Sequence, residues 1–171
     1  MVLLLLRWLI SIILLPGTVL VAIPLALAYV SPILRVPLQA ASFGSLPFWT
    51  SMVPALMSVI LSTWTMALFL RWGGDGTPAP WDPPSQLVIR GPYRYVRNPM
   101  ILGVILMLIA LGTYLGSLLI LGWALTFLLL NNLYFSRIEE PQLLRRFGAP
   151  YAAYCRAVRR WVPRISPWRS A

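Results

Sequence analysis

Long uncharged stretches alternate with short basic segments along this chain of 171 residues. Arg7 and Arg35 enclose 27 uncharged residues, Arg35 and Arg71 enclose 35, and Arg97 and Arg137 enclose 39. A helix that crosses a lipid bilayer needs roughly 20 predominantly apolar residues. Each stretch is therefore long enough to hold at least one membrane-spanning helix.

The lengths of the three stretches predict four spans. In the second stretch, Pro37 and Pro47 interrupt the early part, which leaves room for one span after them. The third stretch would be about 58 Å long as a single helix, which is enough for two short crossings. We expect spans near 8–30, 48–70, 99–114 and 117–135.

The last two spans are expected to form a tight hairpin, because Gly112, Gly116 and Ser117 mark a turn between them. The predicted fold class is an all-α integral membrane protein with four transmembrane helices and a cytosolic amphipathic C-terminal helix. Residues 1–70 hold two N-terminal transmembrane helices. Residues 71–171 hold a loop, the hairpin and the C-terminal helix as one structural domain.

Composition and charge agree with a membrane location. Hydrophobic residues make up 59% of the chain and charged residues 11%, whereas a soluble domain carries about 25% charged residues. Of the 14 Arg residues, only Arg35 lies in the loop between the first two spans. By the positive-inside rule, both termini and loop 71–97 are cytoplasmic. The membrane is expected to be the cell membrane. A cleaved signal peptide ending near Ala26-Leu27-Ala28 is the alternative for the first span.

The missing residue types exclude several kinds of chemistry. The chain has no His and one cysteine, Cys155, so it has no Ser-His or Cys-His catalytic pair, no Cys or His zinc site and no intrachain disulfide. Its four acids lie in two separate segments, which argues against a metal site of any kind. The arginines flank the spans, so they indicate contact with anionic headgroups rather than with nucleic acid.

The end of loop 71–97 contains several structural signals. Gly91-Pro92 indicates a turn. Pro99 suits the first turn of the third span, where a missing N–H costs nothing, and Asn98 then becomes its N-cap. The free N–H groups of this helix start, next to Arg94 and Arg97, predict a corner that attracts anions.

The segment after the fourth span contains the adjacent acids Glu139 and Glu140. Neighbouring residues on a helix diverge by about 100°, so we expect one acid to bind a cationic group and the other to pair with Arg. Farther on, four apolar or aromatic residues recur at helical spacing, with arginines on another face. This pattern predicts an amphipathic helix on the membrane surface. The four apolar or aromatic residues are Tyr151, Tyr154, Val158 and Trp161.

At these residues the chain resembles the integral membrane enzymes of the isoprenylcysteine carboxyl methyltransferase and phospholipid methyltransferase group. The resemblance covers about residues 85–167. It rests on Gln86-Leu87-Val88, Gly91-Pro92-Tyr93, Arg97-Asn98-Pro99 with Gly103, Glu139-Glu140, Phe147-Gly148, Tyr151, Tyr154, Val162-Pro163 and Pro167. In this chain, Asn98 stands where the family usually has His, and Ile101 stands where it usually has Tyr.

The resemblance implies that S-adenosylmethionine is the cofactor, held between the loop, the start of the third span and the acids. It implies that Ser85, Gln86, Leu87 and Val88 line the adenosine side. It also implies that Tyr93, Asn98, Pro99, Met100 and Ile101 approach the methionine or ribose part. Glu139 or Glu140 would accept hydrogen bonds from the ammonium or ribose. We infer that Arg97 meets the cofactor carboxylate and that Arg137 meets an anionic group of the substrate.

The resemblance implies methyl transfer to a lipophilic acceptor, either an isoprenylcysteine-like carboxylate or a lipid amine. The sulfonium already activates the methyl group, so the protein supplies binding and orientation, and no catalytic acid or base is assigned. The lipid bilayer is the expected surrounding, while the oligomeric state is open. Two alternatives remain: a membrane reductase that uses NADPH, and a small non-enzymatic membrane scaffold.

Overall fold

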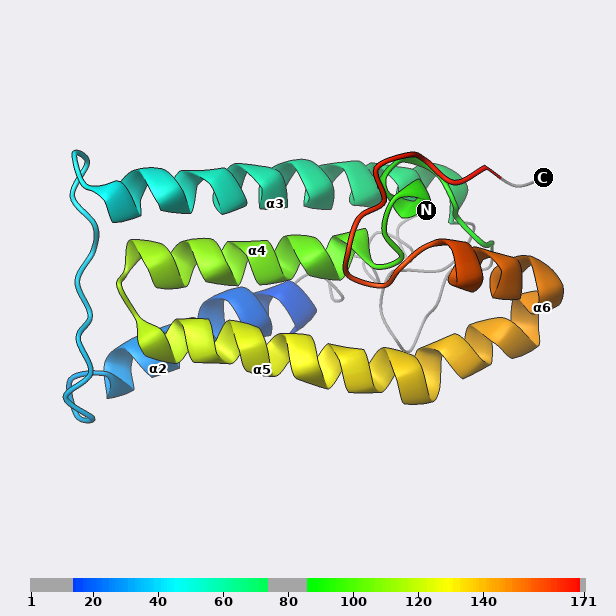
Figure 1. Ribbon diagram of the computed structural model, residues 1–171. Coiled ribbons are helices and arrows are strands. Elements are labelled where there is room, and N and C mark those ends of the chain that lie inside the picture. The colour runs from blue at the N-terminus through cyan, green and yellow to red at the C-terminus, as the bar shows by residue number, and fades with distance from the viewer. Residues whose placement is uncertain (1–13, 74–85, 170–171) are drawn as a thin grey trace, which may run out of the picture. The chain divides into compact units, whose positions relative to one another are not determined.

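A computed structural model describes residues 14–73 and 86–169, and no strand occurs within these ranges. Figure 1 shows the helices in chain order. They are the π-helical turn η1 (Thr18–Ala22), α2 (Ile23–Val30), α3 (Leu46–Trp72), the 3-10 turn η2 (Gly91–Arg94), α4 (Pro99–Tyr114), α5 (Leu118–Tyr134), the π-helical turn η3 (Phe135–Glu139) and α6 (Glu140–Ala157).

Two helices in the described ranges are long and apolar enough to cross a membrane. They are α3, with 27 residues, and the stretch Leu118–Ala157, which comprises α5, η3 and α6 and is kinked at Gly148, where φ is +59° and ψ is −136°. The apolar helices Leu14–Val30 and Pro99–Tyr114 are shorter. The helices coincide with the stretches predicted near 48–70, 99–114 and 117–135, while the crossing of the membrane by four spans stays a prediction.

Proline accounts for both π-helical turns. The N–H of Ile23 donates to the carbonyl of Thr18, and Pro24 follows; the N–H of Glu140 donates to the carbonyl of Phe135, and Pro141 follows. Proline has no N–H with which to continue the regular pattern, so the helix widens by one residue just before it. The second turn directly precedes Glu140.

The chain divides into two compact units. We call Met1–Ile60 with Gly103–Leu128 the apolar unit, and Leu61–Leu102 with Leu129–Ala171 the polar unit. The helices α3, α4 and α5 each contribute residues to both units. The predicted boundary at residue 70 stays a prediction.

In the apolar unit, α4 and α5 form the predicted hairpin. Gly116 has φ +58°, and the N–H groups of Ser117 and Gly116 donate to the carbonyls of Gly112 and Thr113. This pair of bonds is the Schellman arrangement that ends a helix at a left-handed glycine. Gly112 was expected in the turn but lies within α4, where a Cβ would come within 2.8 Å of the Leu121 side chain. Its role is close helix packing.

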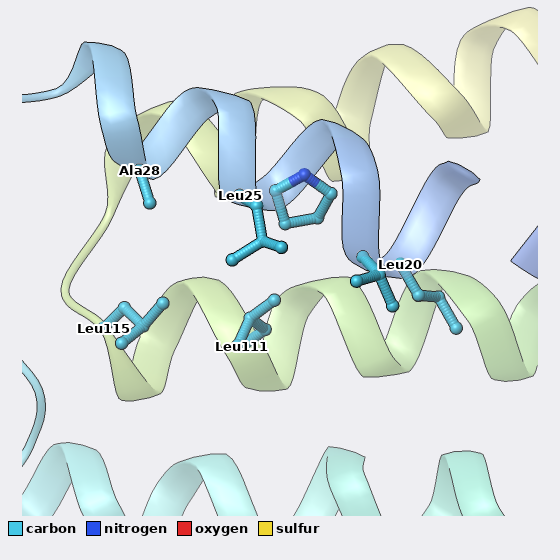
Figure 2. A pocket seen from close by; sticks show the side chains of 7 residues that line it. Leu20, Leu25, Ala28, Leu111 and Leu115 are labelled. Carbon is cyan, nitrogen blue, oxygen red and sulfur yellow. The ribbon is translucent and has the colours of Figure 1, made fainter. Parts of the chain in front are cut away.

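The helix Leu14–Val30 packs on the hairpin within the apolar unit. The indole N–H of Trp123 donates to the carbonyl of Val19 at 3.2 Å. Figure 2 shows the apolar groove of about 210 Å³ between this helix and α4, with Leu20, Leu25 and Leu111 among the side chains that line it. Such an apolar lining fits a surrounding of lipid chains.

Helix α3 reverses the side-chain pattern of a soluble helix. Its buried positions carry small hydroxyl residues seven apart, namely Ser51, Ser58 and Thr65, with at most 3% of each residue exposed. Large apolar residues of the same helix, such as Val53 and Leu56, are more than half exposed. Small residues at helix contacts and large apolar residues facing outward are typical of helices in lipid.

The polar unit is built around an aromatic cluster. Tyr151, Tyr154 and Val158 are buried, and Leu87 and Ile89 pack against them. The prediction that these residues form an amphipathic helix on the membrane surface is therefore wrong in two respects. Helix α6 ends at Ala157, so Val158 and Trp161 are not helical, and both tyrosines are buried within the protein.

The backbone after α6 ends the helix by pairing elsewhere. Val158 is extended, with φ −117° and ψ 125°. The next residues lie beside segment 94–98, as the red and green traces of Figure 1 show. The N–H of Arg97 donates to the carbonyl of Arg159 at 3.0 Å, and the N–H of Arg164 donates to the carbonyl of Tyr95 at 2.9 Å. These bonds replace the helical ones that the spacing pattern had predicted.

Candidate functional site

The linker end before α4 is held by a close turn at Gly91. Its φ is +51°, and a Cβ at this position would lie 2.8 Å from the Trp64 indole nitrogen. Next to the turn, the Arg90 guanidinium lies 3.9 Å from the centre of the Trp72 ring, a cation–π contact. The predicted Gly91-Pro92 turn is confirmed as the 3-10 turn η2, and α3 fixes its position.

The aromatic cluster fixes the same segment from the other side. The Tyr154 hydroxyl donates to the Tyr93 carbonyl at 2.6 Å. The Arg94 Nε donates to the Trp168 carbonyl at 2.7 Å, and the Trp168 N–H donates to the Arg94 carbonyl at 2.9 Å. The irregular backbone that leads into α4 is thus paired with the C-terminal segment.

Glu140 lies where these elements meet. Its Oε1 accepts from Arg97 Nη1 at 2.9 Å and from Arg160 Nε at 2.8 Å. All three side chains are mostly buried, with 14% of Arg97, 22% of Glu140 and 16% of Arg160 exposed. This agrees with the expectation that one of the two acids pairs with Arg.

Asn132 connects this ion pair to α5. Its Oδ1 accepts from Arg160 Nη1 at 2.6 Å and from Trp161 Nε1 at 3.0 Å. Its backbone carbonyl also accepts from Arg160 Nη1, at 3.2 Å. The Arg160 guanidinium therefore bridges Glu140 and Asn132.

Glu139 has a different environment from its neighbour. Burial, with a further contribution from Glu140, raises the pKa of its carboxyl to about 7. Burial also raises the pKa of the Tyr93 phenol well above its ordinary value, and Tyr154 and Glu139 add to that effect. Glu139 is thus a carboxylate that a cationic group would stabilise.

Two buried donors lie at the start of α4. Arg97 Nε and Asn98 Nδ2 have no hydrogen-bond partner among the described residues. Buried polar groups are almost always paired, so donors left open indicate a place for an acceptor group. These two donors suit an anionic group such as a carboxylate, and Glu139 suits a cationic group.

The predicted site residues fall into three groups. Glu140 contacts Arg97 directly, and Glu139 acts electrostatically on Tyr93. Three others belong to the same segments, with Val88 and Pro99 buried and Leu87 packed on the aromatic cluster. Ser85 lies outside the described residues. The remaining side chains are partly buried or exposed, and they are those of Gln86, Met100, Ile101 and Arg137.

The pattern-based prediction missed Asn132 and Arg160. Asn132 lies near the end of the apolar helix α5 in a pair of amides, Asn131-Asn132, and a polar pair at such a position is a usable signal. Arg160 carried no comparable signal because it lies in an Arg-Arg pair, and basic pairs near spans are usually membrane contacts.

Comparison with known proteins decides the family. Residues 49–150, well over half of the chain, match the family model described as phospholipid methyltransferase. The chain belongs to this family. Searches of curated proteins and of solved structures gave no match.

The phospholipid methyltransferase family consists of integral membrane methyltransferases, so this chain is a membrane protein of a methyltransferase family. The matched range includes both acids and the start of α4. It ends at Pro150, so Arg160 and the rest of the C-terminal segment lie beyond it.

Proposed function

We propose that the protein transfers a methyl group from S-adenosylmethionine to a lipophilic acceptor at the boundary between membrane and cytosol. In this proposal the chain crosses the cell membrane four times, with both termini in the cytoplasm. The supporting observation is the 2.9 Å contact between Arg97 and Glu140. It joins the linker before α4 to the acids after α5, which are the two regions that the proposed cofactor site requires.

In the proposed site, Glu139 accepts hydrogen bonds from the cofactor's ammonium group. Arg97 Nε and Asn98 Nδ2 donate to its carboxylate, and Leu87 and Val88 lie on the adenosine side. When bound, the cofactor supplies a methyl group already activated by a positively charged sulfur. The residues of this chain bind it, orient it toward the acceptor and keep water away.

Arg137 is the proposed contact for an anionic group on the acceptor. It is exposed in η3, two residues before Glu139. The acceptor is either an isoprenylcysteine-like carboxylate or a lipid amine, and its apolar part would enter from the bilayer between helices. A carboxylate acceptor needs no base, and an amine can lose its proton to water.

Cofactor binding tests the proposal directly. Calorimetry with S-adenosylhomocysteine on the detergent-purified protein should show binding. Glu139→Gln and Asn98→Ala should weaken it by about tenfold or more, because each removes a charged or buried hydrogen-bonding group. Gln142→Ala, at an exposed position of α6, is the matched control and should bind like the natural protein.

Failure of the intact, folded protein to bind S-adenosylhomocysteine would overturn the proposal. Thermal stabilisation by NADPH alone would favour the reductase. Copurification with a stoichiometric partner, without binding of either ligand, would favour the scaffold.

The acceptor can be identified with radiolabelled S-adenosylmethionine and a total lipid extract. Methyl esters release volatile label as methanol in mild base, whereas methylated amines retain it. Label in the lipid fraction is expected, and the base treatment separates the carboxylate acceptor from the amine acceptor.

A further inference from the structure

The C-terminal segment brings a charged side chain to the centre of the candidate site. Arg160 uses Nε for Glu140, at 2.8 Å, and Nη1 for Asn132, at 2.6 Å. It is 20 residues from Glu140 and 28 from Asn132 along the chain. Neither local helix geometry nor sequence proximity produces these contacts, so the fold itself places Arg160 there.

We propose that Arg160 is a positioning residue of the methyl-transfer site: with Asn132 it fixes Glu140, which in turn fixes Arg97, and this leaves Glu139 as the acid that receives the ligand's cationic group. This inference rests on the proposed function for the identity of that ligand. It deepens the proposal by dividing the work between two adjacent acids and by extending the site beyond the residues that match the family.

The contacts of Glu140 indicate a structural role. One oxygen, Oε1, receives two guanidinium groups within 3 Å. Two cations on a mostly buried carboxylate compensate its charge, so it has less to offer a further cation. Glu140 therefore orients Arg97, whose Nε stays available to a ligand.

The geometry requires arginine at position 160. The planar guanidinium presents donors in fixed directions, and here Nε reaches Glu140 at the start of α6 while Nη1 reaches Asn132 in α5. A lysine ammonium is a compact charge and cannot hold both partners in this arrangement. Asn132 is itself fixed, because its Oδ1 also accepts from Trp161 Nε1.

The pKa of Glu139 reports on this network. The charged group that acts on its carboxyl is Glu140, and the charge of Glu139 in turn acts on the phenols of Tyr93 and Tyr134. Arg97 and Arg160 contact Glu140 and offset its negative charge. Removing Arg160 exposes Glu139 to more of that charge, which moves the pKa of Glu139 further upward.

The test compares Arg160→Gln, Arg160→Lys and the control Arg156→Gln in the full-length protein in detergent. Arg156 is exposed on α6, so its replacement removes the same charge from the same region. S-adenosylhomocysteine affinity should fall about tenfold or more in Arg160→Gln, fall less in Arg160→Lys, and stay unchanged in Arg156→Gln.

A second measurement needs no ligand. The melting temperature of each variant is recorded from pH 5 to 9. The midpoint is the pH at which half of the change in melting temperature has occurred. It should be higher in Arg160→Gln than in the natural protein, and unchanged in Arg156→Gln. Asn132→Ala, which keeps every charge, should move the midpoint in the same direction by a smaller amount and serves if Arg160→Gln does not fold.

The outcomes separate the two proposals. If the natural protein binds no S-adenosylhomocysteine but the midpoint moves as expected, the proposed function is wrong and the positioning network stands. If Arg160→Gln, or Asn132→Ala in its place, matches Arg156→Gln in both measurements, the assignment of Arg160 is overturned.

Discussion

The apolar and polar units use the same three long helices for opposite purposes. In the described residues, Arg35 is the one charged residue of the apolar unit, whereas the polar unit holds Glu139, Glu140 and all the other described arginines. Helices satisfy their own backbone groups, which is the condition for a structure in lipid. Irregular backbone occurs in both units: the N–H groups of Gln39 and Ala41 donate to the carbonyls of Leu115 and Tyr114 in the apolar unit, and the polar unit pairs segment 94–98 with residues after α6. The units differ in charge: the ion pairs of Glu140 with Arg97 and Arg160 join distant segments of the polar unit, whereas the described part of the apolar unit has no acid with which Arg35 could pair.

The glycines sharpen this comparison, and they carry the largest expected effect. In the polar unit, Gly91 has φ +51° and no room for a Cβ against Trp64. In the apolar unit, Gly122 on α5 has no atom within 4 Å of a Cβ built there. Gly91→Val should destabilise the protein by about 4 kcal/mol, since a branched residue at positive φ adds strain to overpacking. A melting curve in detergent measures the loss.

Gly122→Ala is the matched control for this change. It should leave the melting temperature unchanged or raise it slightly, because alanine favours a helix over glycine. A Gly91→Val protein that melts with the natural one would show that the turn at η2 does not hold the polar unit together.

The buried small residue Ser58 on α3, in the apolar unit, has the next largest expected effect. Ser58 is 3% exposed, so a larger side chain must displace its neighbours. Ser58→Leu should cost about 2 kcal/mol through overpacking, although leucine is the more apolar residue. The neighbouring Leu56 is 63% exposed, and Leu56→Ile should change nothing measurable. Thermal unfolding in detergent compares the two, and an unchanged melting temperature for Ser58→Leu would contradict close packing at this face.

The sequence predicted the local features of both units. The positions of α3, α4 and α5 followed from the spacing of charges, because uncharged stretches of this length leave few other places for helix ends. Pro99 begins α4 as predicted, since a residue without an N–H costs nothing there. The left-handed Gly116 lies in the predicted hairpin turn.

The features that escaped prediction depend on contacts between distant residues. The spacing of Tyr151, Tyr154, Val158 and Trp161 fits a helix through all four residues, and it gives no sign that α6 ends at Ala157. The helix ends because backbone groups after it pair with segment 94–98, and a local pattern contains no record of that partner. The position of Arg160 at the site has the same origin.

The smallest expected effect is on the pH dependence of stability, and it distinguishes Glu139 from Glu140 within the polar unit. A glutamate whose pKa is higher in the folded protein binds its proton more tightly there, so folding is favoured at low pH and the advantage is lost as the pH rises. For Glu139, with a pKa raised from 4.5 to about 7, the loss of stability runs across that pH interval.

Between pH 6 and pH 8 the protein should become less stable by about 1 kcal/mol because of Glu139. Glu139→Gln should remove this part of the pH dependence and leave the melting temperature nearly level between pH 6 and pH 8. Glu140→Gln should lower stability across the same range, because Arg97 and Arg160 then share no carboxylate. If Glu139→Gln retained the natural pH dependence, the titrating group would be another residue, and the proposed division between Glu139 as the ligand-binding acid and Glu140 as the structural acid would lose its electrostatic basis.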